Sequence, residues 1–215
     1  IDGNGQSDII YGITGINPIE SGKITINGKE ITNASVRERN LSGIAHIPED
    51  RHKYGLILDY TLEDNIILKD YFKRGMQRFS FINRAKAAQM TDKLIEKYDI
   101  RSSQGGETLC RSMSGGNQQK AIVAREIEQN ADLLIAVQPT RGMDVGAIEF
   151  IHKQIIEQRD ADKAVLLMSL ELDEVMDVSD RILVVFEGKI VADIDPKKTS
   201  IKEMGLYMAG IKKEA

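Results

Sequence analysis

Apolar residues follow two different patterns along the chain, and the change between them divides it into segments. Residues 133–137 and 164–168 are uninterrupted apolar runs, as in strands that are buried on both faces of a parallel sheet. Over residues 49–126, apolar positions instead recur with a helical period. The sequence therefore predicts an α/β core built from residues 1–48 and 127–215, into which residues 49–126 are inserted as a helical subdomain.

Turn and capping residues place further elements in both parts. Asn27 and Gly28 lie between alternating apolar positions, which predicts a type I′ hairpin over residues 22–31. The predicted helix 83–98 has an apolar face that carries Ala87, Met90, Leu94 and Tyr98. The other expected helices cover residues 7–14, 61–68, 114–129, 146–158, 171–178 and a short C-terminal segment, and the other expected strands cover 42–48, 181–186 and 187–194.

A glycine-containing loop opens the chain and leads into the first predicted helix. Glycines at positions 3 and 5 allow backbone N–H groups to approach an anion closely, which is typical of phosphate-binding loops. Such a loop normally carries a lysine where this chain has Gln6, and its acids Asp2 and Asp8 add no cation. An ordinary glycine turn explains this stretch, taken alone, equally well. The candidate nucleotide contacts are Gly3, Asn4, Gly5, Gln6, Ser7 and Asp8, with the Ser7 hydroxyl as a weak candidate Mg²⁺ ligand.

A second glycine motif, SMSGGNQQK at residues 112–120, opens the predicted helix 114–129. A serine and two glycines at a helix start form an anion site. The motif resembles the signature sequence of ABC-type ATPases, usually written LSGGQQ, and it precedes an apolar strand followed by PTRGMD, as in that family. In the family this helix start contacts the γ-phosphate that is bound to a partner domain. The resemblance assigns this role to Ser114, Gly115, Gly116, Asn117 and Gln118.

The resemblance extends over nearly the whole chain and implies a P-loop NTPase core of the ABC ATPase type. The first loop resembles a Walker A motif that lacks its first glycine, so we expect the chain to be part of a longer protein. Residues 43–68, with PEDR followed by GL, resemble the Q-loop region of sugar and nucleoside importers, where Glu49 replaces the usual glutamine. Asp144 corresponds to the D-loop aspartate. The chain is most similar to the second nucleotide-binding half of a tandem importer ATPase. Its QPTRG sequence, residues 138–142, favours a nucleoside importer over one for simple sugars.

Four positions depart from the family pattern in the same direction. Gln6 replaces the Walker A lysine, Val137 the Walker B aspartate, Gln138 the general-base glutamate and Leu170 the switch histidine. An amide holds water but takes no proton, and losing a general base costs about 10²- to 10⁴-fold in rate. Val137 removes a carboxylate that would help to anchor Mg²⁺. We therefore expect this half not to hydrolyse ATP at its own loop, while a catalytically active half of a monosaccharide importer is the alternative.

The family pattern also implies cofactors, partners and a location. ATP and Mg²⁺ are expected mainly at a composite site, to which this chain lends its signature and an N-terminal half lends its Walker motifs. Integral-membrane permease subunits are expected to dock near the Q-loop region, and an extracellular solute-binding protein would act indirectly. The expected location is the cytoplasmic face of the membrane, as a peripheral subunit.

Composition excludes several other classes of protein. A net charge of −4 and a pI of about 5.5 disfavour a general nucleic-acid-binding surface. Cys110 is the only cysteine, which excludes an internal disulfide and fits a reducing compartment. No apolar run reaches the length of a membrane span. The three histidines, at positions 46, 52 and 152, are dispersed along the chain, so we interpret them as ordinary residues and not as a metal site.

Two further function classes compete with the importer reading. A soluble ABC protein of DNA repair or translation usually has a longer insertion and a basic surface, and this chain has neither. A P-loop kinase or GTPase would need the lysine and the Mg²⁺ ligand, and it would leave MSGGNQQ unexplained. The sequence does not identify the transported solute.

Overall fold

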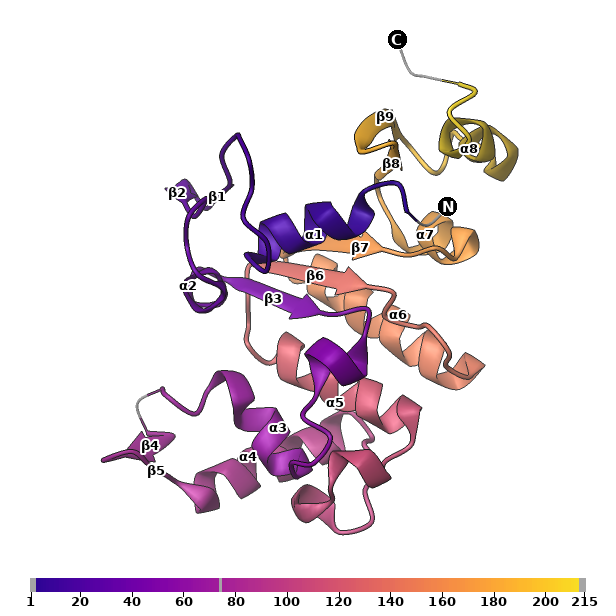
Figure 1. The fold of residues 1–215 in the computed structure, drawn as a ribbon. Coiled ribbons are helices and arrows are strands. Elements are labelled where there is room, and N and C mark those ends of the chain that lie inside the picture. Colours follow the sequence, from indigo (N-terminus) through magenta and orange to yellow (C-terminus); the bar gives the residue numbers. More distant parts are fainter. Residues whose placement is uncertain (1–2, 74, 213–215) are drawn as a thin grey trace. The chain divides into compact units, whose positions relative to one another are not determined.

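The computed structural model describes residues 3–73 and 75–212, which form two compact units (Figure 1). The first, here called the sheet unit, comprises Ile1–His46, Ala131–Gln138 and Arg159–Ala215. The second, the helical unit, comprises Ile47–Asn130 and Pro139–Gln158. The sequence-based division stays a prediction, and it differs from this one mainly at 139–158, which the sequence assigns to the core.

The sheet unit contains a three-stranded sheet in the order β3 (Ile44–Ile47), β6 (Leu133–Val137) and β7 (Ala164–Met168). β6 and β7 pair in parallel along their whole length, so the parallel sheet expected from the two apolar runs is confirmed. Helix α1 (Gln6–Thr14) runs along this sheet (Figure 1). Its Ile10 belongs to a buried cluster with Ile31, Ile44, Ile135 and Val137.

A buried arginine fixes the C-terminal end of α1. Arg39, on α2 (Val36–Leu41), is 2% exposed, and burial lowers the pKa of its guanidinium. It donates to the carbonyl oxygens of Gly12 at 2.6 Å and Ile13 at 2.7 Å, and also to the carbonyl of Thr32 at 2.7 Å. The carbonyls of Gly12 and Ile13 belong to the last turn of α1, where no N–H of the helix reaches them, and the arginine satisfies them.

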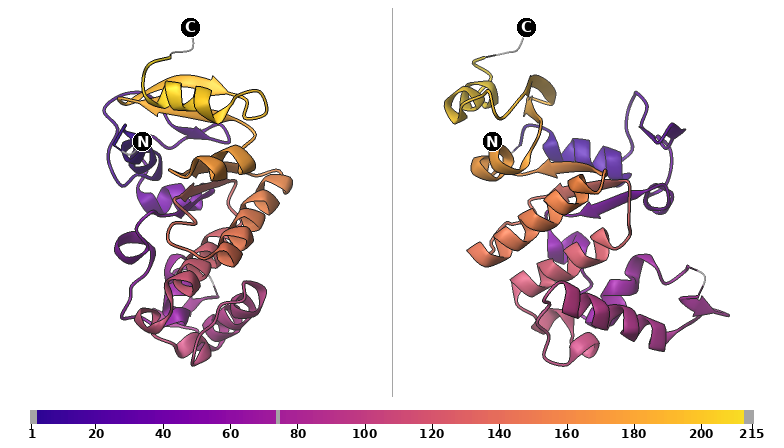
Figure 2. Two further views of the ribbon diagram at one scale, coloured as in Figure 1. Left: turned by 90° about the vertical axis from the view of Figure 1, so that its right-hand side faces the viewer. Right: turned by 180° about the vertical axis from the view of Figure 1, so that it is seen from behind.

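The rest of the sheet unit consists of hairpins and short helices. β1 (Thr25–Ile26) and β2 (Lys29–Glu30) form the predicted I′ hairpin, with Asn27 at φ 50° and Gly28 at φ 77°. After α7 (Leu172–Val178), the strands β8 (Ile182–Phe186) and β9 (Lys189–Ile194) form a separate antiparallel pair. Helix α8 (Ile201–Met208) lies across this pair (Figure 2, left) and buries Met204 and Tyr207 against it.

The helical unit is built around α3 (Leu62–Ile66), α4 (Arg84–Lys97), α5 (Gly115–Ile127) and most of α6 (Val145–Asp160). The apolar face predicted for α4 is confirmed, since Ala87, Leu94 and Tyr98 are buried and Met90 is partly buried beside Ala87. Short turns η2 (Ile67–Lys69), η3 (Gly105–Glu107) and η4 (Cys110–Ser112) connect the helices. Two elements are not predicted by the sequence: a π-helix, η1 (Arg51–Gly55), and a hairpin formed by β4 (Gln77–Arg78) and β5 (Phe81–Ile82). Within residues 3–73 and 75–212, no helix has the length and apolar character that crossing a bilayer requires.

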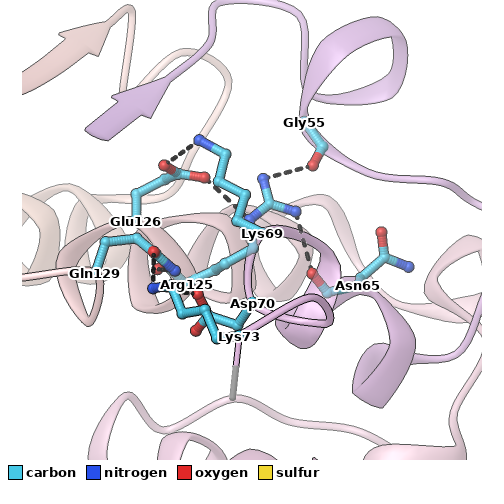
Figure 3. A network of polar contacts seen from close by, with 8 residues as sticks. All are labelled: Gly55, Asn65, Lys69, Asp70, Lys73, Arg125, Glu126 and Gln129. Carbon is cyan, nitrogen blue, oxygen red and sulfur yellow. Dashed lines mark hydrogen bonds and ion pairs between the residues drawn. The ribbon is translucent and has the colours of Figure 1, made fainter. Parts of the chain in front are cut away.

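A buried ionic network holds α3, α5 and η1 together (Figure 3). Glu126 on α5 is 0% exposed and accepts from Arg125 Nε at 3.0 Å and from Lys69 Nζ at 2.6 Å. Arg125 also donates to the carbonyl of Asn65 at 3.2 Å and to that of Gly55 at 2.8 Å. Buried ions need such complete pairing to offset their desolvation.

Replacing Arg125 with methionine is expected to lower the free energy of unfolding by about 3–5 kcal/mol, because a buried carboxylate and two buried carbonyls lose their shared donor. Arg84→Met is the control. Arg84 also pairs with two acids, Glu63 and Asp64, but its side chain is 60% exposed, so the expected loss is about 1 kcal/mol or less. Denaturant unfolding followed by circular dichroism measures both variants, and equal losses would contradict the role given to the buried network.

Candidate functional site

The first glycine loop enters α1 through left-handed backbone at both glycines. Gly3 has φ 86° and Gly5, the N-cap of α1, has φ 97°. A Cβ atom on Gly5 would lie 3.1 Å from the Cα of Gly188, so close approach of another segment also demands glycine there. The predicted loop-to-helix transition is thus present. Asp2 lies outside the described residues.

The side chain of Gln6 folds back over this loop. Its Oε1 accepts a hydrogen bond from the backbone N–H of Asn4 at 2.9 Å. A phosphate loop needs free backbone N–H groups to bind the anion, and a cationic side chain beside the phosphate. Gln6 supplies a carbonyl oxygen instead, and Asp8 adds negative charge in the first turn of α1. In this arrangement the loop does not fit a magnesium-bound triphosphate.

Val137 is the last residue of β6 and Gln138 follows it, and neither is an acid. Val137 is 3% exposed and packs in the cluster that includes Ile10 and Ile135. Gln138 has φ 48°, is 6% exposed, and its Oε1 accepts from the N–H of Leu170 at 3.4 Å. The structure therefore brings together two of the departed positions, Gln138 and Leu170, and neither side chain can exchange a proton near neutral pH. Among the described residues, no group of three His, Cys, Asp or Glu side chains is placed to hold a metal ion.

The second glycine motif caps helix α5 as predicted. Ser114 is the N-cap, and its Oγ accepts from Asn117 Nδ2 at 2.8 Å and more weakly from Asn117 N at 3.4 Å. Gly115 and Gly116 form the first turn of the helix. Gln118 is only 5% exposed, donates to the carbonyl of Cys110 at 2.8 Å and lies 3.0 Å from His52 Nε2. Its side chain therefore holds the turn before the helix.

Arg51 lies against the start of this helix. A Cβ on Gly115 would be 3.2 Å from Arg51 Nη2, so the guanidinium covers the glycine surface directly. Arg51 is partly buried, and among the described residues its side chain has no hydrogen-bond or ion-pair partner. An unpaired cation beside the positive end of a helix is electrostatically unfavourable until an anion binds there.

The two remaining candidate residues also lie in the helical unit. Glu49 pairs with Arg141, with 2.8 Å between Glu49 Oε1 and Arg141 Nη1. Asp144 accepts from the N–H of Ala147 at 3.0 Å and so stabilises the start of α6. Glu49 is thus held by a residue of the PTRGMD motif, a pairing that no local sequence pattern predicts.

Comparison with known proteins decides the family. The model of the family described as ABC transporter matches residues 2–141. The chain belongs to the ABC transporter family. The resemblance of the glycine motifs to that family is thereby confirmed.

Relatives of this ABC chain carry importer names. It is 53% identical over 210 residues to the guanosine import ATP-binding protein NupO of Bacillus subtilis, covering 98% of this chain and 41% of that protein. It is 47% identical over 210 residues to the nucleoside import ATP-binding protein NupA of Lactococcus lactis, again covering 98% and 41%. The chain thus spans about two-fifths of the length of these relatives.

Solved structures agree on the fold. A nucleotide-free ATP-binding cassette from an ABC transporter superposes with a TM-score of 0.77 at 20% identity, over 96% of this chain and 85% of the other. At such identity the likeness shows the fold alone. The predicted fold class, a P-loop NTPase core of the ABC type, is confirmed.

Cys110 beside the signature is expected to resist alkylation in the folded chain. It is 0% exposed, and burial raises the pKa of its thiol from 9.0 to about 11. At pH 8 about one thiol in a thousand is then ionised. Iodoacetamide labelling followed by mass spectrometry should give little product until denaturant is added, and fast labelling of the folded chain would contradict this burial.

The same burial has a consequence for stability at high pH. Because burial raises the pKa of the Cys110 thiol, the folded chain binds this proton more tightly than the unfolded chain does. The stability that this difference contributes is fully present below pH 9.0 and is lost as the pH rises through about 11.

Proposed function

We propose that the chain is the second nucleotide-binding half of an ABC importer ATPase, that it does not hydrolyse ATP at its own loop, and that it lends its signature to the other half. The observation that carries this proposal is the contrast between the two glycine loops. The start of α5 keeps its cap and both glycines, whereas the loop before α1 has an acceptor in place of its cation.

The absence of hydrolysis is supported by the chemistry at the end of β6. Phosphoryl transfer depends on Mg²⁺ and on a residue that positions or deprotonates water. Val137 is a core residue, and the amide of Gln138 is turned toward the backbone of Leu170. Neither group provides a carboxylate for the metal or for water.

A role in trans for the signature is supported by Arg51. The guanidinium adds a positive charge where the N–H groups of Gly115 and Gly116 begin α5. Both features attract the terminal phosphate of a nucleotide. ATP and Mg²⁺ would accordingly be held mainly by the Walker motifs of the N-terminal half.

The transported solute and the remaining partners follow from the relatives. The two relatives with nucleoside names are 53% and 47% identical to this chain, and a glucose import ATP-binding protein of Haloferax volcanii is 38% identical. These values favour nucleosides over simple sugars. Permease subunits, an extracellular solute-binding protein and a position at the cytoplasmic face of the membrane complete the proposal.

Ser114→Arg should lower ATP turnover of the complete subunit by about 10²-fold or more, because it removes the cap and places bulk where the phosphate would bind. The chain alone should show no turnover above background. A phosphate-release assay measures both. Turnover by the chain alone would contradict the loss of hydrolysis, and an unaffected Ser114→Arg subunit would contradict the composite site.

Arg51→Ala should lower turnover of the complete subunit by about tenfold, the effect of losing one charge-assisted contact. Lys53→Ala is the matched control, since Lys53 belongs to the same π-helix but is exposed and lies over the ring of Tyr54. The control should stay within about twofold of the parent. Equal effects of the two substitutions would show that Arg51 has no special position at the signature.

A further inference from the structure

We infer that the side chain of Gln6 closes the phosphate loop of this chain by binding one of its backbone N–H groups, and that the closed loop anchors the β8–β9 turn. The side-chain carbonyl of Gln6 accepts a hydrogen bond from the backbone N–H of Asn4, a donor of the kind that would otherwise bind a phosphate oxygen. The inference rests on the proposed function, because it treats this loop as the counterpart of a nucleotide site.

The exchange of lysine for glutamine reverses the polarity of the side chain. A lysine ammonium has only donors, so it can attract phosphate but cannot satisfy a backbone N–H. Glutamine carries a carbonyl oxygen, and here that oxygen lies 2.9 Å from Asn4 N. The substitution thus removes a cation and also adds an internal competitor for the anion.

Asn4 is held from the opposite side by the turn between β8 and β9. Its carbonyl accepts from Gly188 N at 2.8 Å, and its Oδ1 accepts from Glu187 N at 3.0 Å. Glu187 at φ 46° and Gly188 at φ 73° form a tight hairpin turn whose N–H groups need partners. Gly5 allows this contact, because a Cβ there would reach within 3.1 Å of Gly188 Cα.

These contacts give the loop a structural use that does not depend on nucleotide. The backbone N and O atoms and the side-chain oxygen of Asn4 are all engaged, by Gln6 on one side and by the hairpin turn on the other. An entering phosphate would have to displace Gln6 without gaining a cation in return.

Nucleotide affinity tests this inference on the chain alone, in a Ser114→Glu background whose carboxylate repels an anion from the signature as a second site. Trinitrophenyl-ATP fluorescence, with competition by Mg·ATP, gives the dissociation constants. Gln6→Ala should bind about five- to tenfold more tightly than the parent, because it removes the competitor and adds no charge. Gln6→Lys should bind more tightly again.

The control is Gln104→Ala, which removes an exposed glutamine and should leave the affinity unchanged. Equal or weaker binding by Gln6→Ala would overturn the inference, because glutamine would then be neutral or helpful toward phosphate.

Hydrogen exchange provides a readout that needs no nucleotide. The Asn4 amide should exchange about tenfold faster in Gln6→Ala, and the Glu187 amide about tenfold faster in Asn4→Ala, as expected for the loss of one hydrogen bond each. Unchanged exchange at both amides would overturn the closed loop. ATP turnover by the chain alone would refute the proposed function, whereas the exchange rates of these two amides test the closed loop independently of it.

Discussion

The helical unit depends on one buried carboxylate. Glu126 is completely removed from water, and its charge is acceptable there only because Arg125 and Lys69 pair with both of its oxygens. Arg125 then extends the constraint by donating to the carbonyls of Asn65 and Gly55. The end of α5, the body of α3 and the end of η1 are therefore fixed relative to one another.

A second polar contact completes this constraint at the other end of α5. His52 lies within hydrogen-bonding distance of Gln118, whose amide also donates to the carbonyl of Cys110. The π-helix is thus attached to α5 through His52 and Gly55, and its Arg51 lies beside Gly115. The long side chain of Arg51 thus has a defined position although none of the described residues gives it a polar partner.

Local patterns were sufficient to predict a large part of the fold. The turn at Asn27 and Gly28, the apolar face of α4 and the parallel pairing of β6 with β7 all follow from residue types that are close in sequence. The π-helix does not, because its contacts are with residues far along the chain. Its Gly55 packs so closely against Ile122 that a Cβ on Gly55 would lie 2.6 Å from Ile122 Cδ1. The β4–β5 hairpin was missed for another reason, since its turn places Phe79 at φ 51°, where glycine or asparagine is the usual signal.

The candidate site, like the fold, has features that the sequence predicts and features that it does not. The two glycine motifs and the departures at positions 137, 138 and 170 can be read directly from the sequence. The fold-back of Gln6 onto Asn4 cannot, since glutamine at that position is compatible with several rotamers. The contacts of Asn4 with Glu187 and Gly188 join segments from opposite ends of the chain, and no local pattern anticipates them.

The two loops show how one backbone arrangement acquires opposite properties from its neighbours. Both are helix starts with glycines, so both direct N–H groups outward. At α5 the adjacent side chain is the cation Arg51, whose positive charge reinforces the attraction for an anion. At α1 it is the carbonyl of Gln6, which replaces the anion. On the proposed function, a composite ATP site would draw on the glycines at the start of α5, and the loop before α1 would serve the fold.

The core makes this asymmetry hard to reverse one residue at a time. Val137 is buried against Ile10, Ile44 and Ile135, so an aspartate at 137 would place a charge among aliphatic side chains. An unpaired charge in such a place is strongly destabilising, and the nearby loop, closed by Gln6, offers no cation to pair with it. An aspartate at position 137 would therefore need a cationic partner to be introduced before it or together with it. The order of substitutions that could rebuild the site is therefore constrained by packing as well as by chemistry.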